Sequence, residues 1–169
     1  YYPVRLKPKG ENSLNNLRKT GVDHIELRML DLNPLTPVGI MKEDIFFLQL
    51  MLLYLVLQEE GKFGCVEQLL AIKNAKAAAL YKDTMICIDT RCRHASPIHD
   101  AARDFIQEMK DFYCKIGLDN ENVMDCIEYQ WTKILRPEER YAARVHRQFG
   151  HIYVKRGLHL AEEYTQMLI

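Results

Sequence analysis

Residues 23–40 read DHIELRMLDLNPLTPVGI, and this stretch determines how the rest of the chain is interpreted. After Asp23, polar and apolar residues alternate over residues 24–29, which is typical of a strand because successive side chains point to opposite faces. The polar face carries His24, Glu26 and Arg28. Two prolines then impose a stiff, extended exit. A polar strand face that runs into a rigid loop suits the wall of a binding site.

A second strand is predicted upstream, where residues 1–7 also alternate and Pro3 favours an edge or a strand start. Between the two strands lies a polar loop. Ser13 there is suited to cap a short helix over residues 14–19, and Gly21 to end it. Two strands separated by a short helical excursion can pair in one sheet.

The chain beyond residue 40 is predicted to be mainly helical. Residues 42–60 are apolar nearly all round, which predicts a central buried helix. A short strand-like run covers residues 84–89. The other expected helices occupy residues 65–81, a segment from Pro97 as the first helical residue to 116, residues 122–135, a segment that starts at Pro137, and about 150–167.

Length and composition narrow the class of protein. The 169 residues amount to about one domain, with 48% apolar and 27% charged residues. Lys plus Arg and Asp plus Glu both number 23, so the basic footprint of a nucleic-acid-binding protein is missing. The longest apolar run, residues 45–57, is shorter than the ~20 residues that a membrane span needs. Five irregularly spaced cysteines, without a CxxC motif, predict free thiols in a reducing cytoplasm.

Two ordered patterns carry a family resemblance. Tyr1–Arg5 reads Tyr-x-Pro-hydrophobic-Arg, and Ile25–Pro34 reads Ile-Glu-hydrophobic-Arg-x-Leu-Asp-hydrophobic-Asn-Pro. In these positions the chain resembles the bacterial glutamate–cysteine ligases, both the stand-alone enzymes and the ligase half of the bifunctional glutathione synthases. The likeness is dense over residues 1–40. It becomes thin over the helical remainder.

The resemblance implies an α+β fold. The chain would be the mainly helical C-terminal part of a glutamine-synthetase-like fold, with two or three N-terminal strands from its antiparallel sheet. It would form a single domain or a fragment, in which residues 1–40 carry the active-site strands and loop and residues 41–169 form a helical pack. The missing N-terminal part of the same enzyme would be its partner.

The family's activity is ATP- and Mg²⁺-dependent formation of γ-glutamylcysteine from L-glutamate and L-cysteine, the first step of glutathione biosynthesis. By resemblance, Glu26 is a magnesium ligand, Arg28 stabilises the phosphoryl group during transfer from ATP, and Tyr1 contacts the cysteine substrate. The intermediate would be γ-glutamyl phosphate. Because one carboxylate does not make a magnesium site, we expect these 169 residues alone to be inactive.

Other interpretations of the same residues stay open. The strand pattern alone favours Glu26 as a surface carboxylate paired with Arg28, about 7 Å along the strand. Tyr1 is a chain terminus, where fraying is common. Cys92, His94 and His99 lack an evident fourth zinc ligand. Composition and periodicity without the resemblance would indicate a helical interaction module with no chemistry.

Overall fold

The computed structural model describes residues 3–59, 61–62, 64–79, 87–89 and 95–168. The chain divides into two compact units, which are described separately. Residues 1–33 form the N-terminal unit and residues 34–169 form the helical unit. The predicted α+β class is confirmed, because helices dominate and the strands form small antiparallel sheets.

The N-terminal unit is built on an antiparallel pair of strands, β1 (Val4–Lys7) and β2 (His24–Leu27). Arg5 lies opposite Glu26 in the register, and Lys7 lies opposite His24. Backbone hydrogen bonds extend the pairing past both strand ends. The amide of Asp23 donates to the Lys7 carbonyl and that of Arg28 donates to the Pro3 carbonyl, both at 2.8 Å. Directly opposite residues share one face, so the polar side chains of both strands gather there.

The predicted short helix between these strands is confirmed as α1 (Leu14–Thr20). Ser13 Oγ accepts a hydrogen bond from the amide of Asn16 at 3.2 Å, which satisfies one of the unpaired amides at the helix start. At the other end Gly21 has φ of 76°, a backbone conformation that favours glycine. Its amide donates to the Leu17 carbonyl at 3.0 Å.

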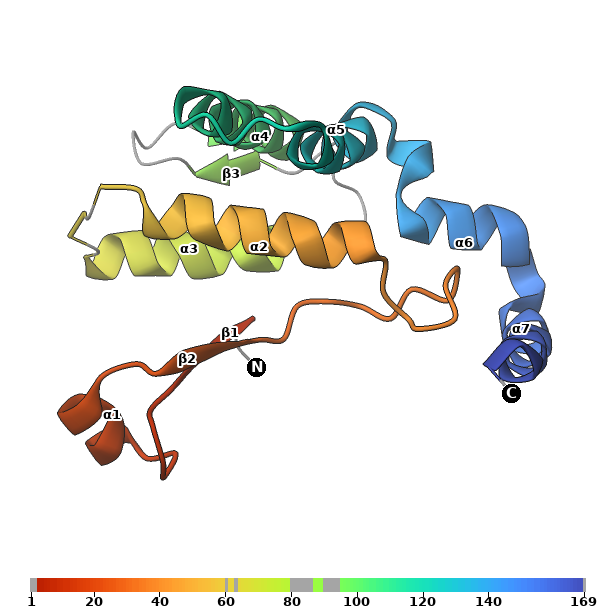
Figure 1. The fold of residues 1–169 in the computed structure, drawn as a ribbon, viewed down its shortest axis with the longest axis horizontal. Coiled ribbons are helices and arrows are strands. Elements are labelled where there is room, and N and C mark those ends of the chain that lie inside the picture. The colour runs from red at the N-terminus through yellow and green to blue at the C-terminus, as the bar shows by residue number, and fades with distance from the viewer. Residues whose placement is uncertain (1–2, 60, 63, 80–86, 90–94, 169) are drawn as a thin grey trace. The chain divides into compact units, whose positions relative to one another are not determined.

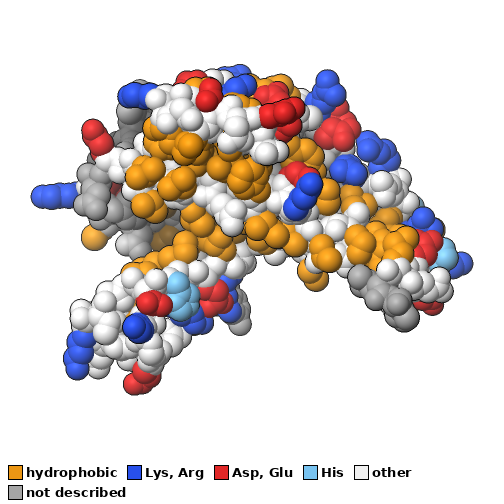
Figure 2. Space-filling model, in the orientation of Figure 1, with side chains coloured by type: hydrophobic (Ala, Val, Ile, Leu, Met, Phe, Trp, Pro, Cys, Tyr) orange, Lys and Arg blue, Asp and Glu red, His pale blue; other side chains and the backbone are white. Residues whose placement is uncertain are grey.

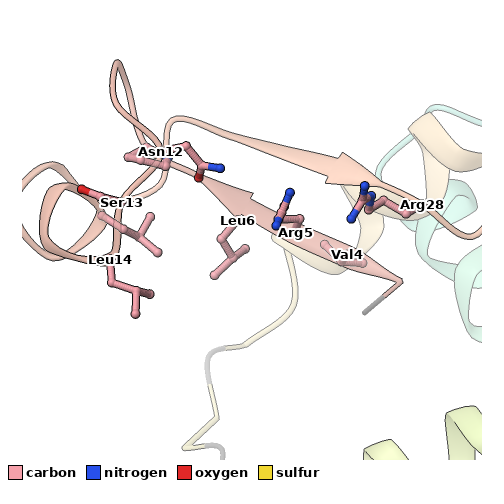
Figure 3. A pocket seen from close by; sticks show the side chains of 9 residues that line it. Val4, Arg5, Leu6, Asn12, Ser13, Leu14 and Arg28 are labelled. Atoms are coloured by element: carbon pink, nitrogen blue, oxygen red, sulfur yellow. The ribbon is translucent and has the colours of Figure 1, made fainter. Parts of the chain in front are cut away.

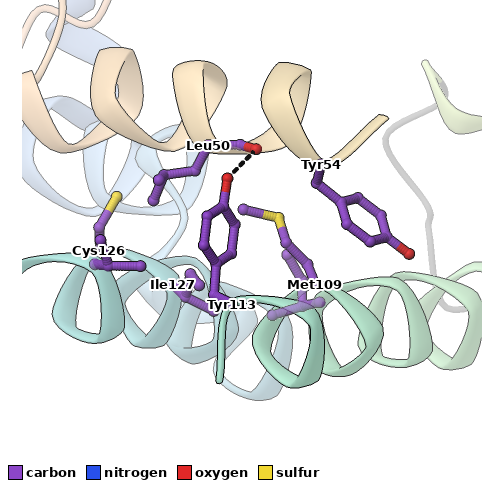
Figure 4. Close-up of a cluster of buried hydrophobic side chains, with 8 residues drawn as sticks. Leu50, Tyr54, Met109, Tyr113, Cys126 and Ile127 are labelled. Carbon is purple, nitrogen blue, oxygen red and sulfur yellow. Dashed lines mark hydrogen bonds between the residues drawn. The ribbon is translucent and has the colours of Figure 1, made fainter. Parts of the chain in front are cut away.

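The core of the helical unit lies between α2 (Lys42–Val56), α4 (Ile98–Lys115) and α5 (Glu121–Leu135). Tyr113 is almost fully buried there, and its hydroxyl donates a 2.7 Å hydrogen bond to the Leu50 carbonyl, which joins α4 to α2 (Figure 4). Buried tyrosines usually need such a partner. The buried cluster consists of Leu50, Tyr54, Ile106, Met109, Tyr113, Val123, Cys126 and Ile127.

The remaining elements complete this unit (Figure 1). Helix α3 (Cys65–Ala78) contacts β3 (Cys87–Asp89), which pairs with β4 (Ala95–Pro97) in a second antiparallel sheet. The C-terminal elements are the 3-10 helix η2 (Pro137–Glu139), α6 (Tyr141–Phe149), the 3-10 helix η3 (Gly150–Ile152) and α7 (Tyr153–Leu168). No helix in the described part of the chain combines the length and apolarity that a membrane crossing requires.

Three sequence expectations were wrong in detail. Helix α2 is not buried all round. Only Leu50 and Tyr54 are buried, whereas its exposed apolar side chains include Ile45, Leu53, Leu55 and Val56. Hydrophobic side chains also show on the face of the molecule seen in Figure 2. Pro97 is the cap residue that precedes α4, not its first residue, because it still belongs to β4. Pro137 starts only a 3-10 turn, and a separate α-helix follows from Tyr141.

Candidate functional site

The polar face of the N-terminal hairpin brings together three cations around one carboxylate. Lys7 Nζ lies 3.3 Å from Glu26 Oε2, and Arg28 Nε lies 2.9 Å from Glu26 Oε1. Each carboxylate oxygen of Glu26 thus faces a different cation. Arg5 is directly opposite Glu26 in the strand register. The cluster carries more positive than negative charge, so its surroundings favour an anionic group.

The electrostatics of Glu26 follow from these neighbours. The hydrogen bond from Lys7 lowers the pKa of Glu26, desolvation opposes that shift, and the charges of Arg28, Lys7 and Arg5 lower it further. The carboxylate is therefore ionised at neutral pH. About 38% of the Glu26 side chain remains exposed, so it is open to a ligand or a metal ion from solvent.

A pocket of about 470 Å³ lies against this hairpin (Figure 3). Arg5 and Arg28 contribute guanidinium groups to it, while the loop before α1 contributes Asn12 and Ser13. The complete lining consists of Val4, Arg5, Leu6, Pro8, Asn12, Ser13, Leu14, Leu17 and Arg28. Two guanidinium groups, an amide and a hydroxyl are donors that suit carboxylate or phosphoryl oxygens. Every one of these residues belongs to the N-terminal unit.

The structure brings together two of the three predicted site residues. Glu26 and Arg28 form an ion pair, which is the contact that the strand pattern alone predicts. Tyr1 lies outside the described residues. Sequence reasoning missed Lys7 as the second partner of Glu26, and it assigned no role to Arg5. The pairing of β1 with β2 would have indicated both residues, because it places them on the face of Glu26.

Of the predicted metal site, the described residues offer one candidate ligand, Glu26, and not a complete set. Within the described ranges no group of three or more His, Cys, Asp or Glu side chains is positioned to hold a metal ion. Glu26 offers hard carboxylate oxygens, which Mg²⁺ prefers. Each oxygen faces one cation, so a metal ion at Glu26 would bind beside Lys7 and Arg28 at the exposed part of the carboxylate.

Of the cysteine and histidine cluster considered for zinc, only His99 belongs to the described residues. Cys92 and His94 lie outside the described residues. His99 lies on α4, and its Nδ1 is 3.4 Å from Arg140 Nη2. Of the other cysteines, Cys65, Cys87, Cys114 and Cys126 are free thiols.

Comparison with known proteins gives a consistent family. Residues 1–78 match the family model described as glutamate-cysteine ligase. The chain is 31% identical over 168 residues to a glutathione biosynthesis bifunctional protein of Listeria innocua, covering 98% of this chain and 22% of that protein. It is 30% identical over 146 residues to a glutamate–cysteine ligase of Saccharophagus degradans, covering 85% of this chain and 28% of that protein.

Solved structures show the same fold. A glutamate–cysteine ligase of Francisella tularensis, solved in complex with AMP, matches with a TM-score of 0.87 at 22% identity, over 99% of this chain and 34% of that one. A bifunctional glutathione synthetase of Pasteurella multocida matches with a TM-score of 0.76 at 20% identity, over 99% and 21% of the two chains. The chain therefore spans about a fifth to a third of the length of these relatives.

Proposed function

Because this chain belongs to the glutamate–cysteine ligase family, we propose that it supplies part of the active site for ATP-dependent formation of γ-glutamylcysteine from L-glutamate and L-cysteine. A carboxylate is a poor electrophile at neutral pH. Transfer of the ATP γ-phosphoryl group to the γ-carboxylate of glutamate gives γ-glutamyl phosphate. The cysteine amine then attacks its carbonyl carbon, and phosphate leaves.

The observation that carries this proposal is the electropositive face of the hairpin. Arg5, Lys7 and Arg28 surround a single carboxylate, so the face has positive charge left over for a phosphoryl or carboxylate group. In this proposal Arg28 binds a phosphoryl oxygen, since a planar guanidinium matches phosphate geometry. Positioning and charge neutralisation are the main tasks of a phosphoryl-transfer site. Tyr1 orients the cysteine substrate in this proposal, by resemblance alone.

Glu26 is proposed as a magnesium ligand in the assembled site. Bound Mg²⁺ would neutralise charge on the phosphate oxygens of ATP. Because the described residues hold no group of three or more possible metal ligands, phosphate oxygens of ATP, water and residues of the remaining part of the enzyme would complete its coordination. The AMP in the Francisella relative agrees with a nucleotide substrate for this family.

We further propose that the 169 residues need the remaining part of the same enzyme to become active. Helix α2 exposes large apolar side chains, and an exposed apolar surface of this kind is typical of an interface. Leu55 and Val56 are 48% and 79% exposed.

The free thiols favour the reducing cytoplasm as the compartment.

The experiment is an assay of ATP-dependent γ-glutamylcysteine formation with identification of the product by mass. It is run with this chain alone, with this chain plus the remaining ligase part, and with Glu26→Gln in the complete protein. The proposal expects product only from the complete protein, and loss of product with Glu26→Gln. Turnover by the 169 residues alone contradicts the requirement for the remaining part.

The competing function is a helical interaction module without chemistry, and the exposed apolar face of α2 is the observation that favours it. Ligand-dependent stability separates the two, because a ligand that binds only the folded protein raises its melting temperature. The active-site proposal expects Mg-ATP plus glutamate to stabilise the complete protein. An interaction module should melt at the same temperature with and without these ligands.

A further inference from the structure

The C-terminal helices hold a strongly basic segment in a chain of balanced charge. Residues 140–161 contain five Lys or Arg residues and three His residues but no Asp or Glu, whereas the whole chain has 23 basic and 23 acidic residues. The segment covers α6, η3 and most of α7. A run of like charge usually forms a solvated surface, so the arrangement of these side chains decides whether it forms a site.

Two of the arginines line one pocket of about 310 Å³ within the helical unit. Its polar lining consists of Arg144, Gln148, Arg156 and Tyr164, and its apolar lining consists of Leu35, Phe149 and Leu160. Phe149 is only 3% exposed, so the floor of the pocket is a fixed part of the packing. Polar donors at the sides and an apolar floor are the usual composition of a small-molecule site.

The helical spacing explains why these side chains meet. Arg144 and Gln148 are four residues apart and share one face of α6. Arg156, Leu160 and Tyr164 follow each other at intervals of four on α7. The Tyr164 hydroxyl donates to the Pro34 carbonyl at 3.5 Å, which ties α7 to the loop that carries Leu35. The walls of the pocket are therefore held by three separate segments of the helical unit.

No acidic side chain among the described residues neutralises the charge in this pocket. Arg144 and Arg156 form no ion pair with any residue in the described ranges. The nearby acidic residue Glu163 pairs instead with His159, at 3.1 Å. Other cations of the helical unit behave differently, since Lys133 pairs with Asp44 and Arg103 pairs with Asp100.

We propose that this pocket binds a small anionic ligand through its carboxylate or phosphate group. Arg144 and Arg156 pair with the anion, Gln148 is placed to donate a further hydrogen bond, and the apolar part of the lining accepts a carbon portion. The proposal is independent of the ligase activity, because no residue of the hairpin site lines this pocket.

Phenyl phosphate and benzoate are suitable probes, because they share an apolar ring and differ in the anion. Benzyl alcohol is the neutral control. Binding to the full-length protein that carries this chain is measured by calorimetry. We expect saturable binding of at least one anion, at least about tenfold weaker binding with Arg156→Gln, and no saturable binding of benzyl alcohol. The preferred anion identifies the ligand as a phosphate or a carboxylate.

Arg147→Gln is the matched control, because Arg147 lies on α6 in the same basic segment but does not line the pocket. Equal weakening by Arg147→Gln and Arg156→Gln would overturn the proposal in favour of a general charge effect. Absence of saturable binding to the folded full-length protein would also overturn the proposal. This includes the case in which an acidic side chain from another part of the protein occupies the pocket. Arg144→Gln tests the second arginine of the pocket in the same way. If that variant unfolds, the result for Arg156→Gln decides the outcome, because Arg156 is exposed and its substitution should not disturb the packing.

Discussion

Arg28 Nε lies 2.9 Å from Glu26 Oε1, so two residues that share the polar face of β2 form an ion pair where that strand ends. The backbone amide of Arg28 is itself held by the Pro3 carbonyl, which fixes where the side chain begins. The pair is half-exposed, and exposed pairs add little to stability. We therefore expect this ion pair to matter more for ligand binding than for the stability of the fold. A substitution that keeps the positive charge separates these two roles.

Arg28→Lys should lower the turnover of the complete ligase by about tenfold or more while leaving its melting temperature unchanged. Lysine keeps the charge beside Glu26 but loses the planar fork that matches a phosphoryl group. Steady-state kinetics with ATP as the varied substrate measure the effect. The matched control is Arg5→Lys, because Arg5 lines the same pocket but, among the described contacts, forms no ion pair with Glu26, and this variant should change turnover less. Equal losses in both variants would assign Arg28 no special part in phosphoryl transfer.

Lys7→Met should raise the pKa of Glu26 towards its ordinary value. The hydrogen bond from Lys7 is the largest cause of the lowered pKa, and Arg28 and Arg5 would remain as weaker ones. Because the folded-state pKa lies below the unfolded one, this carboxylate contributes stability above its unfolded pKa and loses it as the pH falls through the folded value. Carboxyl carbon chemical shifts followed by NMR during an acid titration give the pKa directly.

Lys9→Met is the control for this titration, because this substitution removes the same charge from the exposed loop after β1. We expect it to leave the Glu26 titration within experimental error of the unchanged protein. A Glu26 midpoint that does not move in Lys7→Met would show that the 3.3 Å contact contributes nothing in solution.

Local sequence signals predicted the N-terminal unit well. Ser13, Gly21 and the alternation around Glu26 each act through neighbouring backbone, so the helix α1 and its flanking strands could be derived from them. The second partner of Glu26 could not be derived in this way, because Lys7 reaches it across the hairpin, and that contact depends on a strand register which one sequence does not state. The exposed face of α2 was missed for a related reason. An apolar helix surface that is exposed in this chain has the same amino-acid composition as a buried one, so the sequence does not distinguish them.

Lys133→Met should lower the free energy of unfolding of the helical unit by about 2 kcal/mol, in the range of a charged hydrogen bond. Lys133 Nζ lies 2.8 Å from Asp44 Oδ1 and 4.1 Å from the centre of the Tyr141 ring, with both ion-pair side chains only 15% exposed. Tyr141 also donates to Asp44, at 2.7 Å, so this contact joins α5 and α6 to the start of α2. Urea unfolding followed by the fluorescence of Trp131, the single tryptophan, measures the change.

Lys110→Met is the matched control, since it removes the same side chain from an exposed pair with Glu128 at 3.5 Å. Its cost should stay below about 1 kcal/mol. Comparable losses in the two variants would mean that the partly buried Asp44 contact is worth no more than a surface pair.

Acid should weaken the same contact. Burial acts to raise the pKa of Asp44, but hydrogen bonds from Lys133, Tyr141 and Gln130 outweigh it and lower that pKa below its ordinary value. Asp44 therefore contributes stability above its unfolded pKa and loses it as the pH falls through the lower folded value. Urea unfolding at a series of pH values below 5 should show a steeper loss of stability in the unchanged chain than in Asp44→Asn. Parallel curves would contradict the lowered pKa.

Met109→Ala should be the most destabilising of the methionine truncations that the structure describes, at about 3 kcal/mol. Met109 is fully buried between α2, α4 and α5, and truncation would leave a cavity that the tyrosine hydrogen bond between Tyr113 and Leu50 helps to keep open. Met167→Ala, on α7 with 72% of its surface exposed, removes the same atoms and should cost less than about 0.5 kcal/mol. Urea unfolding of both variants gives the difference. Equal costs would place the core of the helical unit somewhere other than between these three helices, and the hydrogen bond from α4 to α2 would then lose its role in holding them together.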